Sequence, residues 1–166
     1  MGDNIILIGM PGAGKSTIGK KLAKRLEYAF LDVDISIARQ GGMHLQKIIE
    51  TQGLKAFLAL EEEVALTIEA EKTIIATGGS MVYSQAAMEH LKSLGTCVFL
   101  DIHLGALKRR RVNMSTRGIA AQKGLGLEDI YKQRQPLYEK YADITVSCAR
   151  KTVEMIVSEI TEGIQN

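Results

Sequence analysis

The sequence predicts a three-layer α/β/α fold around a parallel β-sheet, and three observations support this class. Short apolar runs alternate with longer stretches of helical periodicity, as in chains built from βα units. The first apolar run, residues 4–8, holds four consecutive apolar residues, which suits a central strand buried on both faces. A glycine-rich segment then separates this run from a helical pattern. With 166 residues, 46% of them apolar, the chain fits one domain, 1–166, with a sizeable core.

The remaining elements follow from the same patterns. The predicted strands are 4–8, 29–33, 73–76, 96–100 and 144–147. The predicted helices are 15–26, 35–39, 45–51, 54–70, 104–111, 127–141 and 152–163. A polar, glycine-containing stretch, 112–126, is predicted to be a mobile loop. The candidate site residues lie beyond the carboxyl ends of the predicted strands, where ligands bind in sheets of this kind.

Composition excludes several classes of function. The formal net charge of +2 is too small to indicate nucleic-acid or membrane binding by bulk electrostatics. The longest apolar stretch near the N-terminus, 5–8, is too short for a signal peptide or a membrane span. Cys97 and Cys148 lie in or beside apolar runs without metal-site spacing, so we expect buried thiols. A reducing cytoplasm is the expected compartment.

The segment 9–17 reads GMPGAGKST and carries the firmest functional signal. Residues 9–16 match the phosphate-loop pattern between a predicted strand and a predicted helix. Glycines allow backbone conformations that other residues resist, so successive N–H groups and the helix N-terminus can point at phosphate oxygens. Lys15 would reach the β and γ phosphates, and Ser16 would offer its hydroxyl to Mg²⁺. The predicted ATP-binding residues here are Gly12, Ala13, Gly14, Lys15, Ser16 and Thr17.

Two carboxylates end the second predicted strand. Asp32 and Asp34 are two residues apart, so in an extended chain they point to the same side. Like charges so close need cations or hydrogen-bond donors around them, and a metal plus an acceptor hydroxyl is one such arrangement. The alternative is a helix N-cap, because Asp34 precedes the apolar Ile35 and Ile37.

The remaining candidates are weaker when taken singly. Gly78 and Gly79 follow the third strand, where they let backbone N–H groups approach a ligand or simply form a turn. Arg117 lies in the polar loop and could stabilise a transferring phosphoryl group, although a lone loop arginine is usually a solvated charge. Arg134 lies shortly before a proline inside a predicted helix. Such a proline frees backbone groups and kinks the helix, which indicates a specific structural or functional role for this segment. The run 109–111 is all arginine, and a solvated helix face is its alternative reading.

Together these residues resemble the shikimate kinase family, within the nucleoside-monophosphate-kinase-like group of P-loop proteins. The resemblance covers nearly the whole chain and rests on the phosphate loop, on FLDVD at 30–34, on ATGGS at 76–80, on Arg117 and on RQPLY at 134–138. It implies a five-stranded parallel sheet in the order 2-3-1-4-5. It also implies transfer of the γ-phosphoryl group of ATP to a ring hydroxyl of shikimate, with Mg²⁺.

The family pattern implies a role for each matching residue. On the donor side, Asp32 would organise Mg²⁺ with Ser16, and Lys15 would stabilise the transferring charge. Arg117 would close over the phosphates with a lid at about 112–126, and Arg110 would lie against the adenine face.

On the acceptor side, which involves about 34–61, the pattern implies four residues. Asp34 would accept a hydrogen bond from the acceptor hydroxyl and could act as its base. Gly78 and Gly79 would contact the acceptor, and Arg134 would pair with its carboxylate.

Several positions depart from the family pattern on the acceptor side. Leu58 stands where the family has an arginine that grips the shikimate carboxylate, and Leu54 replaces a glutamate. Losing one charged partner of a ligand costs roughly 1.5–3 kcal/mol, or about tenfold to a hundredfold in affinity. Glu61 keeps its place on an otherwise apolar helical stripe, and Lys55 or Arg134 is the partner we expect for it.

Two smaller departures concern neighbouring motifs. Ser80 ends what is a glycine triplet in the family, and the lid motif is reduced to RGIA at 117–120. Three functions follow from these patterns: a shikimate kinase, a related kinase of another small hydroxylated metabolite such as a sugar acid or polyol, and a nucleotide-binding regulator without transfer activity. We expect a monomer whose partners are ATP and a small hydroxylated acid, with neither nucleic acid nor membrane.

Overall fold

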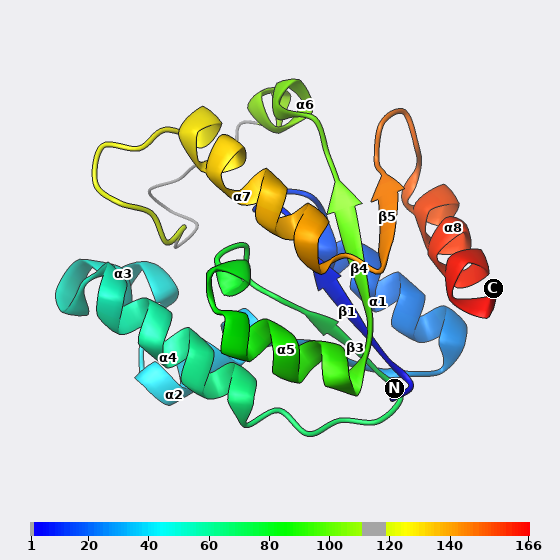
Figure 1. The fold of residues 1–166 in the computed structure, drawn as a ribbon, viewed down its shortest axis with the longest axis horizontal. Helices are drawn as coiled ribbons and strands as arrows, with labels where there is room; N and C mark the ends of the chain where they lie inside the picture. The colour runs from blue at the N-terminus through cyan, green and yellow to red at the C-terminus, as the bar shows by residue number, and fades with distance from the viewer. Residues whose placement is uncertain (1, 111–118) are drawn as a thin grey trace.

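The computed structural model describes residues 2–110 and 119–166 (Figure 1). Its strands are β1 (Asn4–Ile8), β2 (Ala29–Asp32), β3 (Thr73–Ala76), β4 (Gly95–Asp101) and β5 (Ile144–Ser147). Its α-helices are α1 (Lys15–Leu26), α2 (Val33–Gly41), α3 (Leu45–Gln52), α4 (Leu54–Leu66), α5 (Gln85–Leu94), α6 (Leu104–Arg109), α7 (Leu127–Tyr141) and α8 (Val153–Gln165). A short 3₁₀ helix, η1 (Met81–Tyr83), follows β3.

The strands form one parallel sheet in the order β2-β3-β1-β4-β5, which confirms the predicted topology. Strand β1 lies at its centre, where Ile6 is paired with Ile75 of β3 and with Cys97 of β4. Every residue of β1 is buried, as expected for a strand covered on both faces. Because all strands run the same way, the segments after β1, β2 and β3 meet at one edge of the sheet.

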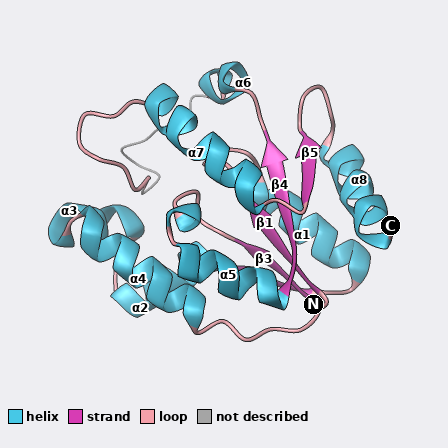
Figure 2. Cartoon of the chain, viewed as in Figure 1, coloured by secondary structure: helices cyan, strands magenta, loops and turns pink. Residues whose placement is uncertain are grey.

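Helices cover both faces of the sheet, so the three-layer class is confirmed (Figures 1 and 2). Helices α1 and α8 pack against each other on one side, and α5 and α7 contact β4 on the other. Helices α2, α3 and α4 form a group of their own that is joined to the body through the contact of α4 with α5. This group places α4 beside the carboxyl ends of the strands.

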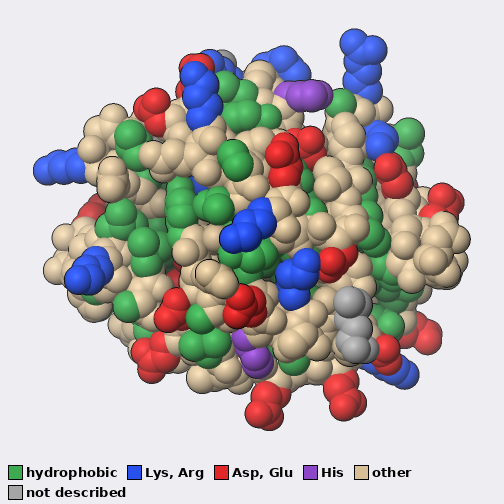
Figure 3. All heavy atoms as spheres, in the orientation of Figure 1, with side chains coloured by type: hydrophobic (Ala, Val, Ile, Leu, Met, Phe, Trp, Pro, Cys, Tyr) green, Lys and Arg blue, Asp and Glu red, His purple; other side chains and the backbone are tan. Residues whose placement is uncertain are grey.

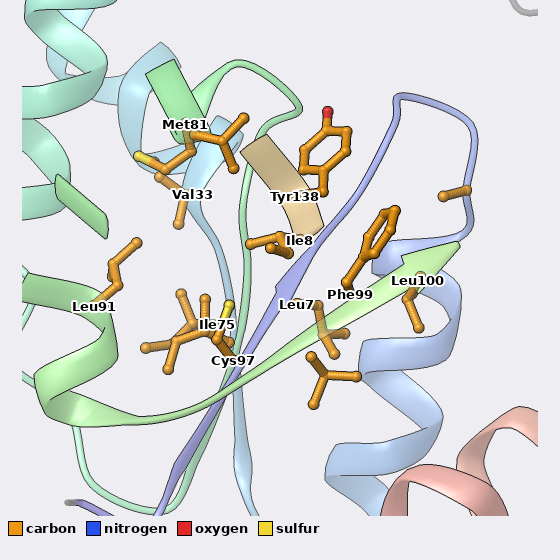
Figure 4. Close-up of a cluster of buried hydrophobic side chains, with 14 of the residues drawn as sticks. Leu7, Ile8, Val33, Ile75, Met81, Leu91, Cys97, Phe99, Leu100 and Tyr138 are labelled. Atoms are coloured by element: carbon orange, nitrogen blue, oxygen red, sulfur yellow. The ribbon is translucent and has the colours of Figure 1, made fainter. Parts of the chain in front are cut away.

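An apolar core supports that edge of the sheet (Figure 4). The rings of Phe99 on β4 and Tyr138 on α7 stack with centroids 5.2 Å apart. Figure 4 shows the Tyr138 hydroxyl pointing away from the apolar cluster, and it donates to the Gly79 carbonyl at 2.7 Å. The core therefore reaches directly into the loop that follows β3.

Several element boundaries differ from the sequence prediction, and hydrogen bonds of the end residues explain two of them. Strand β2 ends at Asp32 rather than at residue 33, because the Asp32 side chain accepts from the Asp34 amide and begins α2. Helix α4 ends at Leu66 rather than at residue 70. The next residue, Thr67, donates its hydroxyl to the Val64 carbonyl at this helix end.

Helix α5 was missing from the sequence prediction. It begins where the Ser84 hydroxyl accepts from the Ala87 amide, and it buries Ala87, Met88 and Leu91. The signal was present as an N-cap serine followed by apolar residues at helical spacing.

The distribution of charged side chains on the surface agrees with the small net charge of the sequence (Figure 3). Lysine, arginine, aspartate and glutamate side chains are interspersed on the face shown in Figure 3. Both cysteines are free and buried, as predicted. None of the helices within 2–110 and 119–166 has both the length and the apolar character needed to cross a bilayer.

Candidate active site

A cavity of about 420 Å³ lies at the carboxyl ends of β1, β2 and β3. It brings together most of the residues selected from the sequence: Gly12, Gly14, Lys15, Ser16, Thr17, Asp32, Asp34, Gly78, Gly79, Arg110 and Arg134. Ala13 does not line it; its side chain is buried beneath the loop, and its amide donates to the Met10 carbonyl. Arg117 lies outside the described residues.

The phosphate loop has the backbone that its glycines were expected to allow. Gly12 and Gly14 adopt φ values of 86° and 96°, in the left-handed region that other residues rarely occupy. Gly14 also begins α1, so the N-terminal amides of this helix face the cavity end of the sheet. The loop can therefore receive phosphate oxygens without further rearrangement of these turns.

Lys15 lies buried within this loop. Its Nζ atom donates to the carbonyls of Gly9 and Met10 at 2.6 and 2.9 Å. Burial lowers the pKa of Lys15 to about 8, while the nearby Asp34 carboxylate opposes the shift. The side chain is thus mainly an ammonium at neutral pH, held where a triphosphate would contact the loop.

The two carboxylates at the end of β2 have a different backbone placement from the one predicted. Asp32, not Asp34, caps α2, and Asp34 lies within the helix, so the two do not share one side of an extended strand. The Asp32 Oδ2 atom also accepts from the Ser16 hydroxyl at 3.2 Å. Burial is the largest cause of the raised pKa of Asp34, followed by the Asp32 charge, while Lys15 opposes both. A raised pKa strengthens Asp34 as a proton acceptor.

The pair of Ser16 and Asp32 fits the ligand requirement of Mg²⁺. This ion takes oxygen ligands and usually binds through one or two carboxylates together with substrate phosphates. In the described part of the chain, no three acidic, histidine or cysteine side chains gather into a larger metal cluster. One hydroxyl and one carboxylate beside a phosphate loop are therefore suited to a metal that arrives with a nucleotide.

The two glycines after β3 leave room for charged side chains, which a simple turn would not require. A Cβ atom on Gly78 would lie 2.7 Å from Asp34 Oδ1 and 3.0 Å from Glu61 Oε2. A Cβ atom on Gly79 would lie 2.7 Å from Arg134 Nη1. Any larger residue here would push these groups away from their positions.

Arg134 is almost fully buried, with 1% of its surface exposed. Its Nη2 atom donates to the Ala120 carbonyl at 2.6 Å, and its Nε atom donates to the Tyr83 hydroxyl at 3.3 Å. The guanidinium also lies over the Tyr83 ring, 5.3 Å from its centroid. These contacts leave Nη1 at Gly79 on the cavity wall, where it can donate to an anion.

Glu61 has a different partner from the one expected. Its two carboxylate oxygens accept from the Ser80 hydroxyl at 2.8 and 3.0 Å. The direct contact is this hydroxyl rather than Lys55, while the charge of Arg134 also favours the ionised form of Glu61. Burial raises the pKa of Glu61 to about 7, and the Ser80 hydrogen bond partly offsets this.

The described part of the predicted lid contributes to the same cavity. Ile119 and Ala120 are buried and line it. Arg110, just before the undescribed segment, donates to the Gly12 carbonyl at 2.6 Å. The predicted mobility of 112–126 stays a prediction, since most of its first half lies outside the described residues.

Sequence reasoning missed Tyr83, Tyr138 and the role of Ser80. Tyr138 stands four residues after Arg134, one helical turn along α7, and this spacing could have indicated a shared face. Ser80 was noted as a departure, yet its hydrogen bond to Glu61 depends on the packing of α4 against the loop after β3. Tyr83 left no local signal.

Comparison with known proteins was consistent with this geometry. A family model described as shikimate kinase matches residues 11–165. The chain is 41% identical to a shikimate kinase from Rippkaea orientalis, in an alignment that covers 98% of this chain and 88% of the relative. It is 37% identical to a shikimate kinase from Blochmanniella floridana, covering 94% and 89%.

Solved structures give the same result. A shikimate kinase from Acinetobacter baumannii in complex with shikimate superposes with a TM-score of 0.88 at 29% identity, covering 99% of this chain and 94% of that one. A shikimate kinase from Aquifex aeolicus superposes with a TM-score of 0.84 at 32% identity, covering 98% and 96%.

Proposed function

Because the chain belongs to the shikimate kinase family, we propose that it transfers the γ-phosphoryl group of ATP to a hydroxyl of shikimate. The reaction class is phosphoryl transfer to an alcohol. One observation carries the proposal for this chain: a phosphate loop with its lysine and a buried arginine line the same cavity. Such a cavity can hold a triphosphate at one end and a small anionic alcohol at the other.

On the donor side, the loop residues Gly12–Thr17 would bind the phosphates. Lys15 would place its ammonium against the oxygens that gain charge during transfer. Ser16 and Asp32 would hold a Mg²⁺ ion, which supplies charge neutralisation at the phosphate oxygens when bound. Arg110 and Arg117 would complete the nucleotide site, with the lid at about 112–126.

On the acceptor side, the segment 34–61 and the loop after β3 would form the binding surface. Arg134 would bind the carboxylate through Nη1, and Gly78 and Gly79 would contact the ring. Asp34 would accept the proton of the attacking hydroxyl. Its partly buried position on the cavity wall next to Gly78 supports this assignment. A monomeric state and a cytoplasmic location stay predictions.

The leucine at position 58 is a reason to consider a second class of acceptor. Leu58 removes a cation that the family pattern places at the acceptor, so another small hydroxylated metabolite, such as a sugar acid or polyol, is the alternative substrate. A coupled assay of ADP release across shikimate, quinate and sugar acids distinguishes the two. We expect the highest kcat/KM with shikimate; a higher value for a sugar acid would favour the alternative. ADP release that no acceptor increases would favour a regulator without transfer activity.

Leu58→Arg is expected to lower the KM for shikimate by about tenfold. The new guanidinium would join that of Arg134 at the proposed binding site for the acceptor's carboxylate. Steady-state kinetics with saturating ATP measure this effect. Ala59→Arg, one residue further along α4 at an exposed position, is the matched control and is expected to leave KM unchanged. An equal KM in Leu58→Arg and the wild type would show that position 58 does not face the acceptor.

A further inference from the structure

The pair formed by Glu61 and Ser80 is a feature that the proposed roles do not use. Glu61 has 2% of its surface exposed, yet both residues line the cavity. The Ser80 hydroxyl donates to the Glu61 carboxylate, and Ser80 is itself buried. A buried carboxyl group needs such a donor, since an unpaired one would be strongly destabilising.

The position of this pair places it at the acceptor end. The Oε2 atom of Glu61 lies beside Gly78, the same glycine that the Asp34 carboxylate approaches. Leu58, one turn earlier on α4, is half-buried and carries no charge. Among the described residues, the acceptor end therefore holds the guanidinium of Arg134 together with the carboxyl groups of Asp34 and Glu61.

We propose that Glu61, held by Ser80, is a specificity-determining residue whose ionisation competes with binding of the acceptor's carboxylate. The proposal rests on the proposed function, in which the acceptor is a hydroxylated carboxylate. A protonated Glu61 leaves the charge of Arg134 available to the acceptor. An ionised Glu61 adds a negative charge to the cavity wall and disfavours a second carboxylate.

The groups around Glu61 determine the pH range in which this competition occurs. Asp34 of α2 disfavours its ionisation, while Arg134 of α7 and the Ser80 hydroxyl favour it. Tyr83 of η1 lines a neighbouring hollow with Glu61 and Glu62. Within the residues described, no charged group of α3 or α5 adds to these influences. With its pKa raised to about 7 by burial, Glu61 changes charge near neutral pH.

The sign of the effect follows from this pKa. Below pH 7, Glu61 is mainly neutral and the acceptor anion binds most tightly. Above pH 7, Glu61 ionises and the KM for shikimate rises. Binding of the anion must also raise the pKa of Glu61, so the protein takes up protons on binding near pH 7. A like charge of this kind is worth about one half to one pKa unit, or about 3- to 10-fold in KM.

The test is the KM for shikimate between pH 6 and pH 8.5 in the wild type, Glu61→Gln and Ser80→Ala. We expect the wild-type KM to rise about 3- to 10-fold and the rise to disappear in Glu61→Gln. In Ser80→Ala the midpoint should move to higher pH, because the hydrogen bond that favours the ionised form is lost. Calorimetry in buffers of different ionisation enthalpy should show proton uptake that Glu61→Gln reduces.

Glu63→Gln is the matched control, since Glu63 lies on the same helix but is exposed and outside the cavity. It should keep the wild-type profile. An unchanged rise in Glu61→Gln, with Asp34 still present, would overturn the proposal. If Glu61→Gln does not fold, an unshifted midpoint in Ser80→Ala would overturn it as well. Failure of the proposed function would look different, because the wild type would then show no binding or turnover of shikimate at any pH.

Discussion

Lys15→Ala is expected to lower the kcat for phosphoryl transfer by at least about 10³-fold. The ammonium of Lys15 is buried in the phosphate loop, where the carbonyls of Gly9 and Met10 hold it close to the proposed triphosphate site. Its removal takes away a preorganised charge that no exposed lysine can replace. Coupled measurement of ADP release with saturating shikimate gives the size of the effect.

The control for this change is Lys24→Ala, an exposed lysine on the same helix. It is expected to turn over at the wild-type rate. Circular dichroism should show that both variants are folded. In Lys15→Ala, the loss of two hydrogen bonds destabilises the fold, but the loss of a buried charge offsets this effect. Wild-type turnover in Lys15→Ala would exclude the phosphate loop as the donor site.

Asp34→Asn is expected to lower kcat by about 10²- to 10⁴-fold while leaving the KM for ATP nearly unchanged. The amide keeps the shape of the side chain beside Gly78 but cannot accept the proton of the acceptor hydroxyl. The pH profile supplies an independent check. Asp34 must be ionised to act, and its pKa is raised, so wild-type kcat should fall as pH is lowered through that raised value.

Asp3→Asn removes an exposed carboxylate close to the start of β1 and serves as the control. It should reproduce the wild-type kcat and pH profile. An Asp34→Asn variant with normal kcat would assign the proton transfer to another group or to water.

The phosphate-loop side of the cavity could be predicted largely from local sequence. The phosphate loop is a contiguous pattern whose glycine conformations follow from residue type, and β1 follows from four adjacent apolar residues. The parallel sheet was predicted from the alternation of elements, and its strand order from the family resemblance. The phosphate loop and β1 depend on residues that are neighbours in the chain, whereas the strand order does not.

The acceptor half was harder because its contacts join distant segments. Asp32 was interpreted as one of two strand carboxylates, whereas its side chain ends the strand by capping α2. The partner of Glu61 could not be identified from α4 alone, because Ser80 reaches it from the loop after β3. The orientation of Arg134 likewise depends on Tyr83 and Ala120, which lie far from it in sequence. Side-chain contacts of this kind become visible once the fold places the segments together.

The most direct test of the central claim is the mass-spectrometric detection of phosphorylated shikimate after incubation of the purified protein with ATP, Mg²⁺ and shikimate. We expect one equivalent of monophosphorylated shikimate for each equivalent of ADP, and neither product when shikimate is omitted. ADP formed without phosphorylated shikimate, or at the same rate in the absence of shikimate, would contradict the assignment of this cavity as a site of transfer from ATP to shikimate.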